Sequence, residues 1–389
     1  MTHPATATVL APHEPRGEGA RLTVDLNAVA HNVRLLRRRT AAELMAVVKA
    51  DGFGHGAVDV ARTAIAAGAG WLGVTSVDEA AALRDAGLRV PVLSWLNPVD
   101  ADFDTAVRRC VDLAVPSRDH LDAIARADGL ARVHLHLDTG MARDGAEPGA
   151  WLELCRRAYA AEREGRIRVV GVMGHLACAE TPGHPANAAG RRLFEWGVAA
   201  ARDAGLRPAV RHLAASAAAL TEPRAHFDLV RVGAALVGID PTGTTALRTA
   251  LTLAAPVVAV RRVAAGTPVG YGHAWHAPAA TTLGLVPVGY GDGLPRHAWA
   301  RAEVQVRGRR RRIAGRISMD QLVVDLGDDP VRPGETATVF GPGGGGEPTL
   351  QDWAGWADTI AHELVTGLGP RLRRHVLPAD NRDPHGSLT

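Results

Sequence analysis

Short apolar runs rich in β-branched residues alternate with alanine-rich amphipathic segments from about Leu44 to Gly238. Apolar runs bounded by turn residues predict buried strands, and the amphipathic segments between them predict helices. The predicted strands cover residues 44–50, 71–76, 91–96, 111–116, 131–138, 168–176, 209–214 and 228–233. Helices are predicted between most of them, for example over 78–85, 119–128 and 187–204. Eight strand–helix units in series predict an α/β fold, a (β/α)8 TIM-like barrel.

The pattern changes after Pro241, where helical segments give way to short alternating strands separated by Gly and Pro. Segments 251–263, 281–293 and 321–329 are examples. A second, mainly-β domain is therefore predicted at the C-terminal side of the barrel. The expected organisation is a flexible N-terminal tail over 1–20, the barrel over 21–244, the β domain over 245–378 and a C-terminal tail over 379–389.

Composition narrows the class of protein without naming a partner. Hydrophobic residues make up 47% of the chain, charged residues 22%, and the formal net charge is +3, which is typical of a soluble globular protein. The three cysteines are odd in number and widely spaced, which favours neither a disulfide framework nor a zinc site and indicates a cytoplasmic protein. The sequence offers no signal-peptide h-region and no uncharged span long enough for a membrane.

Two compositionally biased segments invite other functions. The basic run 307–312 lacks interleaved aromatic residues and lies between two strand-like stretches, so a solvated hairpin is predicted there and no nucleic-acid binding. The glycine tract 341–346 lacks the Lys-Ser/Thr pair and the following helix of a phosphate loop, so it is interpreted as a flexible turn.

Lysine usage is the most informative feature of the composition. The chain has 44 Lys and Arg residues, and Lys49 is the only lysine among them. A guanidinium replaces lysine wherever a surface needs a cation, but it stays protonated and cannot form an imine with an aldehyde. A lysine that persists alone is therefore a candidate for covalent chemistry.

The active site of such a barrel lies at the C-terminal ends of its strands. Polar residues at or just after the predicted strands are Lys49, Arg143, His175, Ser216 and Arg231. The last two loops commonly form a phosphate site, which Ser216 and the backbone amides of Gly233 and Ala234 would supply here. An amine and a phosphate site on one face indicate a small phosphorylated aldehyde, pyridoxal 5'-phosphate (PLP), held by Lys49 as an imine that an amino-acid substrate displaces.

Nine ordered segments resemble motifs of the alanine racemase family. They are 46–56 (AVVKADGFGHG), 138–145 (DTGMARDG), 174–180 (GHLACAE), 212–216 (HLAAS), 230–241, 268–273 (PVGYGH), 286–296, 315–326 and 368–374, and the similarity extends over about 21–376. The resemblance implies fold type III PLP enzymes: a PLP-binding barrel, and a head-to-tail homodimer in which each site combines one barrel with the partner's β domain.

The resemblance also implies roles for individual residues. Lys49 and the partner's Tyr271 match the two catalytic bases, which would face opposite sides of the planar intermediate and so invert the configuration at Cα. A phenol ordinarily ionises near pH 10, so such a base needs a cationic or hydrogen-bonded setting. The residues that match cofactor-binding positions are Lys49, Phe53, Arg143, His175, Ser216, Arg231, Gly233, Ala234 and His362. Those that match substrate-binding positions are Arg143, Met319 and Asp320.

Arg231 corresponds to the arginine that faces the pyridine nitrogen in the family, where a permanent cation discourages protonation of the ring. Related decarboxylases have a carboxylate at that position, so Arg231 favours racemisation. A different reaction on the same cofactor, such as decarboxylation, aldol cleavage or transamination, is the second interpretation. A non-catalytic cofactor-binding protein is the third, and the presence of the β domain with Tyr271 argues against it.

Four positions depart from the family pattern. Phe53 and His362 replace tyrosines, Ala215 replaces an asparagine, and His136 replaces a lysine that is carbamylated in many relatives and braces the active-site arginine. One interpretation is drift within a tolerant family. The other is an altered substrate, such as serine or a larger polar amino acid, because two imidazoles change the polarity of the pocket.

Overall fold

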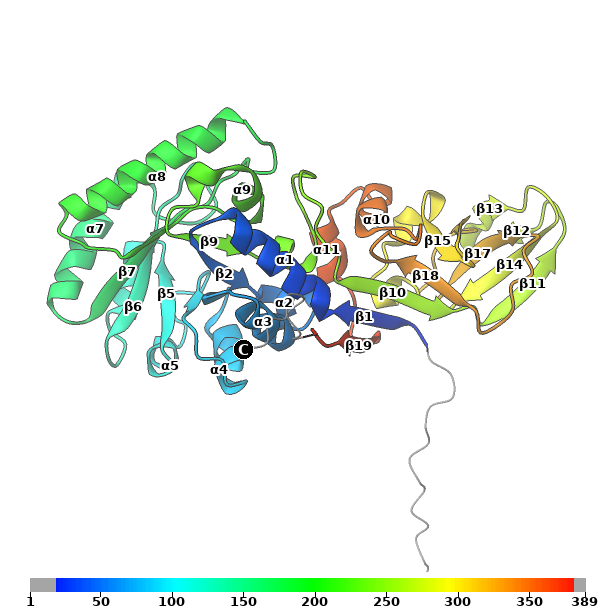
Figure 1. Cartoon of the computed structure of the whole chain (residues 1–389), viewed down its shortest axis with the longest axis horizontal. Coiled ribbons are helices and arrows are strands. Elements are labelled where there is room, and N and C mark those ends of the chain that lie inside the picture. Colours follow the sequence, from blue (N-terminus) through cyan, green and yellow to red (C-terminus); the bar gives the residue numbers. More distant parts are fainter. Residues whose placement is uncertain (1–18, 381–389) are drawn as a thin grey trace, which may run out of the picture. The chain divides into compact units, whose positions relative to one another are not determined.

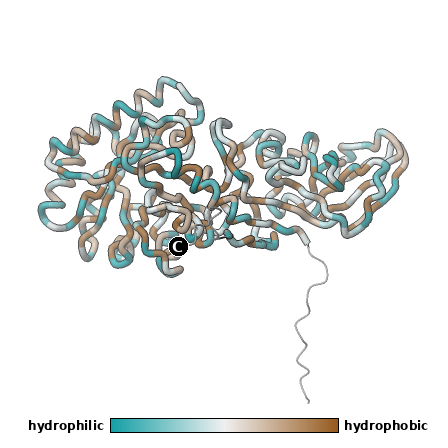
Figure 2. The backbone as a smooth tube through the Cα atoms, in the orientation of Figure 1, coloured by the Kyte–Doolittle hydropathy of each residue, from teal (hydrophilic) through white to brown (hydrophobic). Residues whose placement is uncertain are grey.

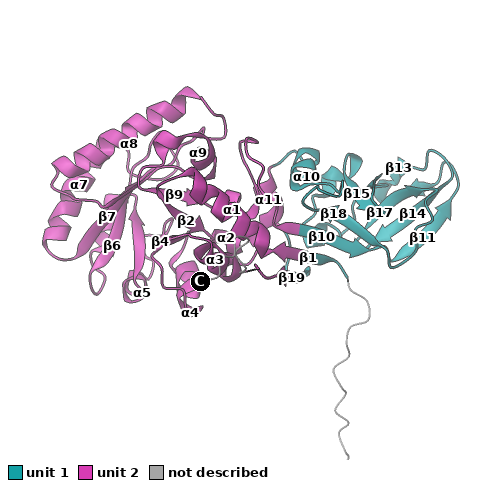
Figure 3. Cartoon of the chain, viewed as in Figure 1, with its two compact units in different colours: residues 1–22, 252–359, 368–375 teal, residues 23–251, 360–367, 376–389 magenta. Residues whose placement is uncertain are grey.

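The computed structural model describes residues 19–380, which divide into two compact units (Figure 3). Within the described residues, the barrel unit comprises 23–251, 360–367 and 376–380, and the β unit comprises 19–22, 252–359 and 368–375. The tails predicted over 1–20 and 379–389 lie almost entirely outside the described residues.

Eight parallel strands form the sheet of the barrel unit, in the order β8-β7-β6-β5-β4-β3-β2-β9 (Figure 1). They are β2 (Glu43–Val47), β3 (Trp71–Val74), β4 (Val92–Ser94), β5 (Val111–Val115), β6 (Ala131–His136), β7 (Ile167–Met173), β8 (Val210–His212) and β9 (Leu229–Val232). Every strand predicted from the sequence overlaps one of them, and the predicted TIM-like barrel is confirmed. One detail of the prediction is wrong: β2 ends at Val47, so Lys49 does not close the strand and instead begins the next element.

The two end strands, β8 and β9, meet at a seam that closes the barrel. Two backbone hydrogen bonds cross this seam, from Asp228 N to Arg211 O and from Arg231 N to Ala214 O, both 3.0 Å. The Arg211 guanidinium also forms a bidentate pair with the Asp228 carboxylate at 2.7 and 2.8 Å. The seam therefore depends on side chains as well as on backbone pairing.

Helices follow most strands, and several begin with a side-chain cap that accepts from the first turn, as Ser76 and Ser117 do. They are α1 (Leu26–Arg39), α2 (Lys49–Gly54), α3 (Ala57–Ala66), α4 (Val77–Asp85), α5 (Phe103–Arg108), α6 (Arg118–Ile124), α7 (Pro148–Arg163), α8 (Pro185–Asp203), α9 (Ser216–Thr221) and α11 (Ala361–Thr366). The alternation of apolar and polar positions that predicts α8 is visible in Figure 2. Helix α6 ends at Ile124, four residues before the predicted 128, and the chain continues in turns with hydrogen bonds from Arg126 N to Ala123 O and from Ala127 N to Ile124 O.

The β unit is mainly β, as predicted. Its strands, some of which extend into residues of the barrel unit, are β1 (Arg21–Asp25), β10 (Leu251–Pro256), β11 (Ala259–Val263), β12 (Pro268–Val269), β13 (Trp275–His276), β14 (Thr281–Val286), β15 (Glu303–Val306), β16 (Arg309–Arg312), β17 (Leu322–Gly327), β18 (Thr336–Phe340) and β19 (Arg373–Leu377). They form sheets in the orders β16-β15-β18-β10-β1-β19, β11-β14-β17 and β12-β13. The remaining elements are α10 (Leu350–Trp356) and the short 3-10 helices η1 (Pro223–Ala225), η2 (Ala234–Val237), η3 (Tyr271–His273), η4 (Tyr290–Asp292) and η5 (Arg296–Ala300).

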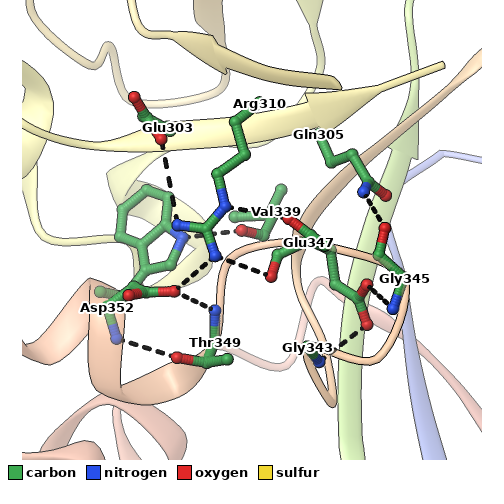
Figure 4. A network of polar contacts seen from close by, with 11 residues as sticks. Glu303, Gln305, Arg310, Val339, Gly343, Gly345, Glu347, Thr349 and Asp352 are labelled. Carbon is green, nitrogen blue, oxygen red and sulfur yellow. Dashed lines mark hydrogen bonds and ion pairs between the residues drawn. The ribbon is translucent and has the colours of Figure 1, made fainter. Parts of the chain in front are cut away.

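The basic run and the glycine tract lie together in the β unit (Figure 4). The basic run forms β16, which pairs with β15 as a hairpin, and Arg310 forms hydrogen bonds with Gly346 O, Glu347 O and the Asp352 carboxylate. The Glu347 carboxylate accepts from the amides of Gly343 and Gly345, both at 2.9 Å. A carboxylate of the chain itself thus occupies the amides that a phosphate would need.

Among residues 19–380, no helix is both long enough and apolar enough to cross a bilayer.

Candidate active site

Lys49 stands at the start of a left-handed turn. Ala50, Asp51, Gly52 and Phe53 have φ between 50° and 63°, and three of them are not glycine. Left-handed backbone costs a residue with a Cβ about 1–2 kcal/mol, so other contacts must hold this turn. Hydrogen bonds from Gly52 N to Val48 O and from Ala50 N to the Glu79 carboxylate, both 2.8 Å, do so. The turn fixes the direction in which Lys49 leaves the strand end.

The surroundings of Lys49 favour its neutral amine. Burial and the nearby Arg143 cation lower the pKa of Lys49, and Glu79 opposes them only in part. Glu79 is itself engaged, because its second oxygen accepts from Thr75 N and Thr75 Oγ1 at 2.8 Å. A half-buried lysine with a lowered pKa is a better nucleophile and base at neutral pH than a solvated one.

The predicted phosphate side of the site lies between α9 and η2. Ser216 Oγ accepts from Gly233 N at 3.1 Å and from Ala235 N at 3.3 Å. Gly233 also lies against Phe53, since a Cβ at position 233 would come within 2.6 Å of the Phe53 ring. The structure brings together Ser216 and Gly233, which the sequence predicts for one site, and it also places the amide of Ala235 against Ser216. Loop spacing alone gave no signal for Ala235.

Arg231 is buried, with 5% of its surface exposed, and its terminal nitrogens are fully engaged. Nη1 donates to His212 O at 2.9 Å and lies 3.2 Å from His212 Nδ1. Nη2 donates to Gly174 O at 2.7 Å and lies 3.3 Å from His175 Nδ1. Nε forms no hydrogen bond with any described residue. Burial lowers the pKa of Arg231 to about 10, so the guanidinium remains a cation at neutral pH, with one N–H left for a ligand.

His175 is held between the loops that follow β6 and β7. Thr139 Oγ1 donates to His175 O at 2.6 Å and accepts from His175 N at 3.1 Å. Burial, then the cations of Arg231 and Arg143, lower the pKa of His175 to about 3. His175 is therefore neutral at physiological pH.

Arg143 lies near the tip of the loop that follows β6, and it is exposed. The Asp138 carboxylate shapes this loop by accepting from the amides of Gly140, Met141 and Ala142. Arg143 and His175 line one small cavity of about 10 Å³, together with His136 and Asp144. The DTGMAR motif thus brings Arg143 to the strand ends, as predicted from the sequence.

Two of the unusual residues carry buried nitrogens that form no hydrogen bond with the described residues. His136 Nδ1 lies 3.4 Å from the Asp144 carboxylate, and neither His136 Nδ1 nor His362 Nδ1 has a hydrogen-bond partner among the described residues. The imidazole of His136 keeps the pKa of Asp144 below its usual value. The centroids of the His362 and Phe53 rings lie 6.2 Å apart. Burial lowers the pKa of His362, and the nearby Glu180 opposes this only in part.

The other predicted residues belong to the β unit. Tyr271 is 66% exposed and Met319 is 52% exposed. Two hydrogen bonds, from Tyr290 N to Ser318 O and from Gly291 N to Met319 O, join the Met319 loop to η4. Arg371 Nη1 donates to the Asp320 carboxylate at 2.7 Å. The β unit therefore presents a large aromatic and a large apolar side chain on supported loops.

Comparison with known proteins identifies the family. The family model described as alanine racemase, N-terminal domain, matches residues 24–241, and that described as alanine racemase, C-terminal domain, matches 250–376. The alanine racemase of Streptomyces coelicolor is 49% identical over 371 residues, which cover 91% of this chain and 95% of that protein. The alanine racemase of Mycolicibacterium smegmatis is 47% identical over 94% of this chain and 96% of its own length.

Solved structures agree with these sequence comparisons. The crystal structure of alanine racemase from D-cycloserine-producing Streptomyces lavendulae matches with a TM-score of 0.91 and 43% identity, covering 94% of this chain and 98% of that one. The Streptomyces coelicolor enzyme matches with a TM-score of 0.89 and 48% identity, covering 92% and 98%. Both domains, their order and nearly the whole length of the chain are thus matched, and the chain belongs to the alanine racemase family.

Proposed function

We propose that this chain is a PLP-dependent racemase that interconverts L-alanine and D-alanine. The observation that carries the proposal is Arg231, a buried cation whose Nε–H has no acceptor among the described residues. A fixed cation facing the cofactor's ring nitrogen discourages protonation of the ring, and this favours proton transfer at Cα over decarboxylation. Alanine is proposed as the substrate because the relatives are named alanine racemase.

The barrel offers one group for each polar end of PLP. The hydroxyl of Ser216 and the amides of Gly233 and Ala234 would bind its phosphate, and Arg231 would face its ring nitrogen. Lys49 would bind its aldehyde carbon. Phe53, His362, Arg143 and His175 would complete the cofactor pocket. Bound PLP supplies an electron sink that acidifies the substrate's Cα–H bond.

Two bases on opposite faces would invert the configuration. Lys49 takes a proton from Cα or returns one on one face, for which its lowered pKa is suited. The partner subunit's Tyr271 does the same on the other face. A head-to-tail homodimer is part of the proposal, and the exposure of Tyr271 and Met319 in the single chain supports it, because large apolar side chains exposed on loops are what a subunit interface covers.

The substrate carboxylate would be bound by Arg143 together with the partner subunit's Met319 and the partner subunit's Asp320. The three cysteines are unpaired, which supports a reducing cytoplasm as the site of action.

A second candidate substrate class is serine or a larger polar amino acid. The buried Nδ1 of His362, which has no hydrogen-bond partner among the described residues, favours it, because it offers a polar group beside Phe53 where the family pattern has phenols. The test is incubation of the purified, PLP-loaded enzyme with each L-amino acid, followed by separation of products on a chiral column. Dominant turnover of alanine supports the leading proposal and ends the second. Release of carbon dioxide without racemisation would refute both.

A further inference from the structure

A chain of buried polar side chains runs from the ion pair of Arg132 and Asp112 to the cation of the active site. Asp112 on β5 lies 3.3 Å from His134 Nε2, and His134 Nδ1 on β6 lies 2.8 Å from His212 Nε2 at the end of β8. His212 Nδ1 lies 3.2 Å from Arg231 Nη1. Asp112, His134 and His212 are each at most 1% exposed.

The two imidazoles meet because the strand between them carries a glycine. Gly171 on β7 pairs with His134 on one side and with Val210 on the other. A Cβ at position 171 would lie 2.4 Å from His134 Nδ1, the atom that contacts His212. The absence of a side chain at Gly171 is therefore a condition for this contact.

The two ends of the chain fix the direction of every hydrogen bond in it. The Asp112 carboxylate can only accept, and the Arg231 guanidinium can only donate. His212 Nδ1 must then be bare toward Arg231, and His134 Nε2 must carry a proton toward Asp112. A neutral imidazole carries one N–H, so the proton of a neutral His212 lies on Nε2. His212 Nε2 then donates to His134 Nδ1, which must be bare. Both histidines are therefore Nε2–H tautomers.

The charges at the ends agree with this arrangement. Burial alone would raise the pKa of Asp112, but hydrogen bonds from His134 and Arg132 outweigh it and keep the carboxylate ionised. Arg132 donates to Asp112 at 2.7 and 3.2 Å. Complete burial, above all, lowers the pKa of His212 well below its usual value, so this ring is neutral. Among the described residues, no three His, Cys, Asp or Glu side chains gather as metal ligands would.

We propose that Asp112, His134 and His212 form a relay that fixes the tautomer of His212 and thereby holds Arg231 in place with its Nε–H directed to the ligand. The three are positioning residues, because they would act on the ligand only through Arg231. Residues outside a site commonly orient the side chains within it through chains of hydrogen bonds. The part of this proposal that concerns catalysis rests on the proposed racemase function.

The tautomers themselves are the first test, and they need no assay of activity. The PLP-loaded enzyme is prepared with ¹⁵N-labelled histidine, and long-range ¹H–¹⁵N correlation spectra distinguish Nδ1–H, Nε2–H and doubly protonated rings. Signals are assigned by their loss in His134→Gln and His212→Gln. Neutral Nε2–H forms are expected for both residues. An Nδ1–H form or a cation at His212 would overturn the relay.

The second test compares two buried or half-buried carboxylates that each bind an arginine in bidentate fashion. In Asp112→Asn, the oxygen pairs with Arg132 and the amide N–H faces His134, which reverses the relay. We expect kcat to fall by about tenfold, with KM for alanine changed by less than about twofold, and an altered absorbance spectrum of the bound cofactor. Asp228→Asn removes the partner of Arg211 without reaching His212, so kcat should stay within about twofold.

Equal kcat in the two variants, with an unchanged His212 tautomer in Asp112→Asn, would refute the relay. If Asp112→Asn does not fold, the wild-type spectra still decide the question. An enzyme that racemises alanine but shows an Nδ1–H His212 would refute the relay alone. A protein with the expected tautomers but no racemase activity would refute the proposed function and leave the relay standing.

Discussion

Replacing Gly54 by alanine should damage the active-site turn more than an ordinary glycine substitution would. Gly54 has φ 76° and packs on α11, and a Cβ at this position would lie 2.3 Å from Val365 O. The left-handed backbone costs an alanine about 1–2 kcal/mol. Displacing the carbonyl of a packed helix adds about 1–3 kcal/mol. The sum is a loss of about 2–5 kcal/mol in the free energy of unfolding.

Gly87→Ala is the matched control. Gly87 has φ 84° and nothing within 4 Å of its would-be Cβ, so only the backbone cost of about 1–2 kcal/mol applies. At roughly 2–4 °C per kcal/mol for a unit of this size, calorimetry should show a Tm lowered by roughly 4–20 °C in Gly54→Ala and by roughly 2–8 °C in the control. PLP affinity should fall only in Gly54→Ala, because the turn joins Lys49 to the helix that carries His362.

Equal Tm values for the two variants, or full PLP affinity in Gly54→Ala, would show that contact with α11 does not support the site.

Three further predictions concern individual side chains. Lys49→Arg retains the charge but not the primary amine, so the visible absorbance of the PLP-loaded protein and its marking by borohydride should both be lost; retention of either would contradict the assignment of Lys49. Tyr271→Phe should lower kcat by about 10²–10⁴-fold and still allow exchange of the α-proton of one enantiomer in deuterated water, since only one of two bases is removed; unchanged kcat would exclude Tyr271 as a base. Because the pKa of His175 is lowered to about 3, the folded state binds fewer protons than the unfolded state between that value and the ordinary 6.5. The stability contributed by neutral His175 is therefore present above pH 6.5 and is lost as the pH falls toward 3, so His175→Gln should lose less stability than wild type over this window in urea titrations.

The barrel strands could be predicted from the sequence because burial on both faces leaves near-continuous apolar runs in parallel strands. Even so, the prediction placed Lys49 within the strand, since nothing local to 44–50 marks the end at Val47. The left-handed turn at 50–53 could not be predicted, because three of its residues have side chains that disfavour this backbone. Only Gly52 and the neighbouring Gly54 and Gly56 hint at it.

The candidate site was accessible to sequence analysis where motifs lie at strand ends, as with Ser216 and Arg231. The relay was not, because His134 and His212 are 78 residues apart and meet only across β7. The contact of Glu79 with the Ala50 amide could not be predicted either. A glutamate in the first turn of a helix is explained by the favourable charge it adds there, so nothing in the sequence indicates a second partner.

Arg231 has a structural role in the barrel in addition to its charge. Its side chain extends from β9 and donates to the carbonyls of His212 and Leu213 at the end of β8. It also donates to the carbonyl of Gly174, which follows β7. The two terminal nitrogens of Arg231 therefore link β9 to the chain at the ends of β7 and β8 and help to hold the barrel closed, while Nε forms no hydrogen bond with any described residue. A substitution of Arg231 that changed the reaction would also remove these hydrogen bonds between the strand ends. Other residues would have to replace them, and this restricts which substitutions the barrel can accept at position 231.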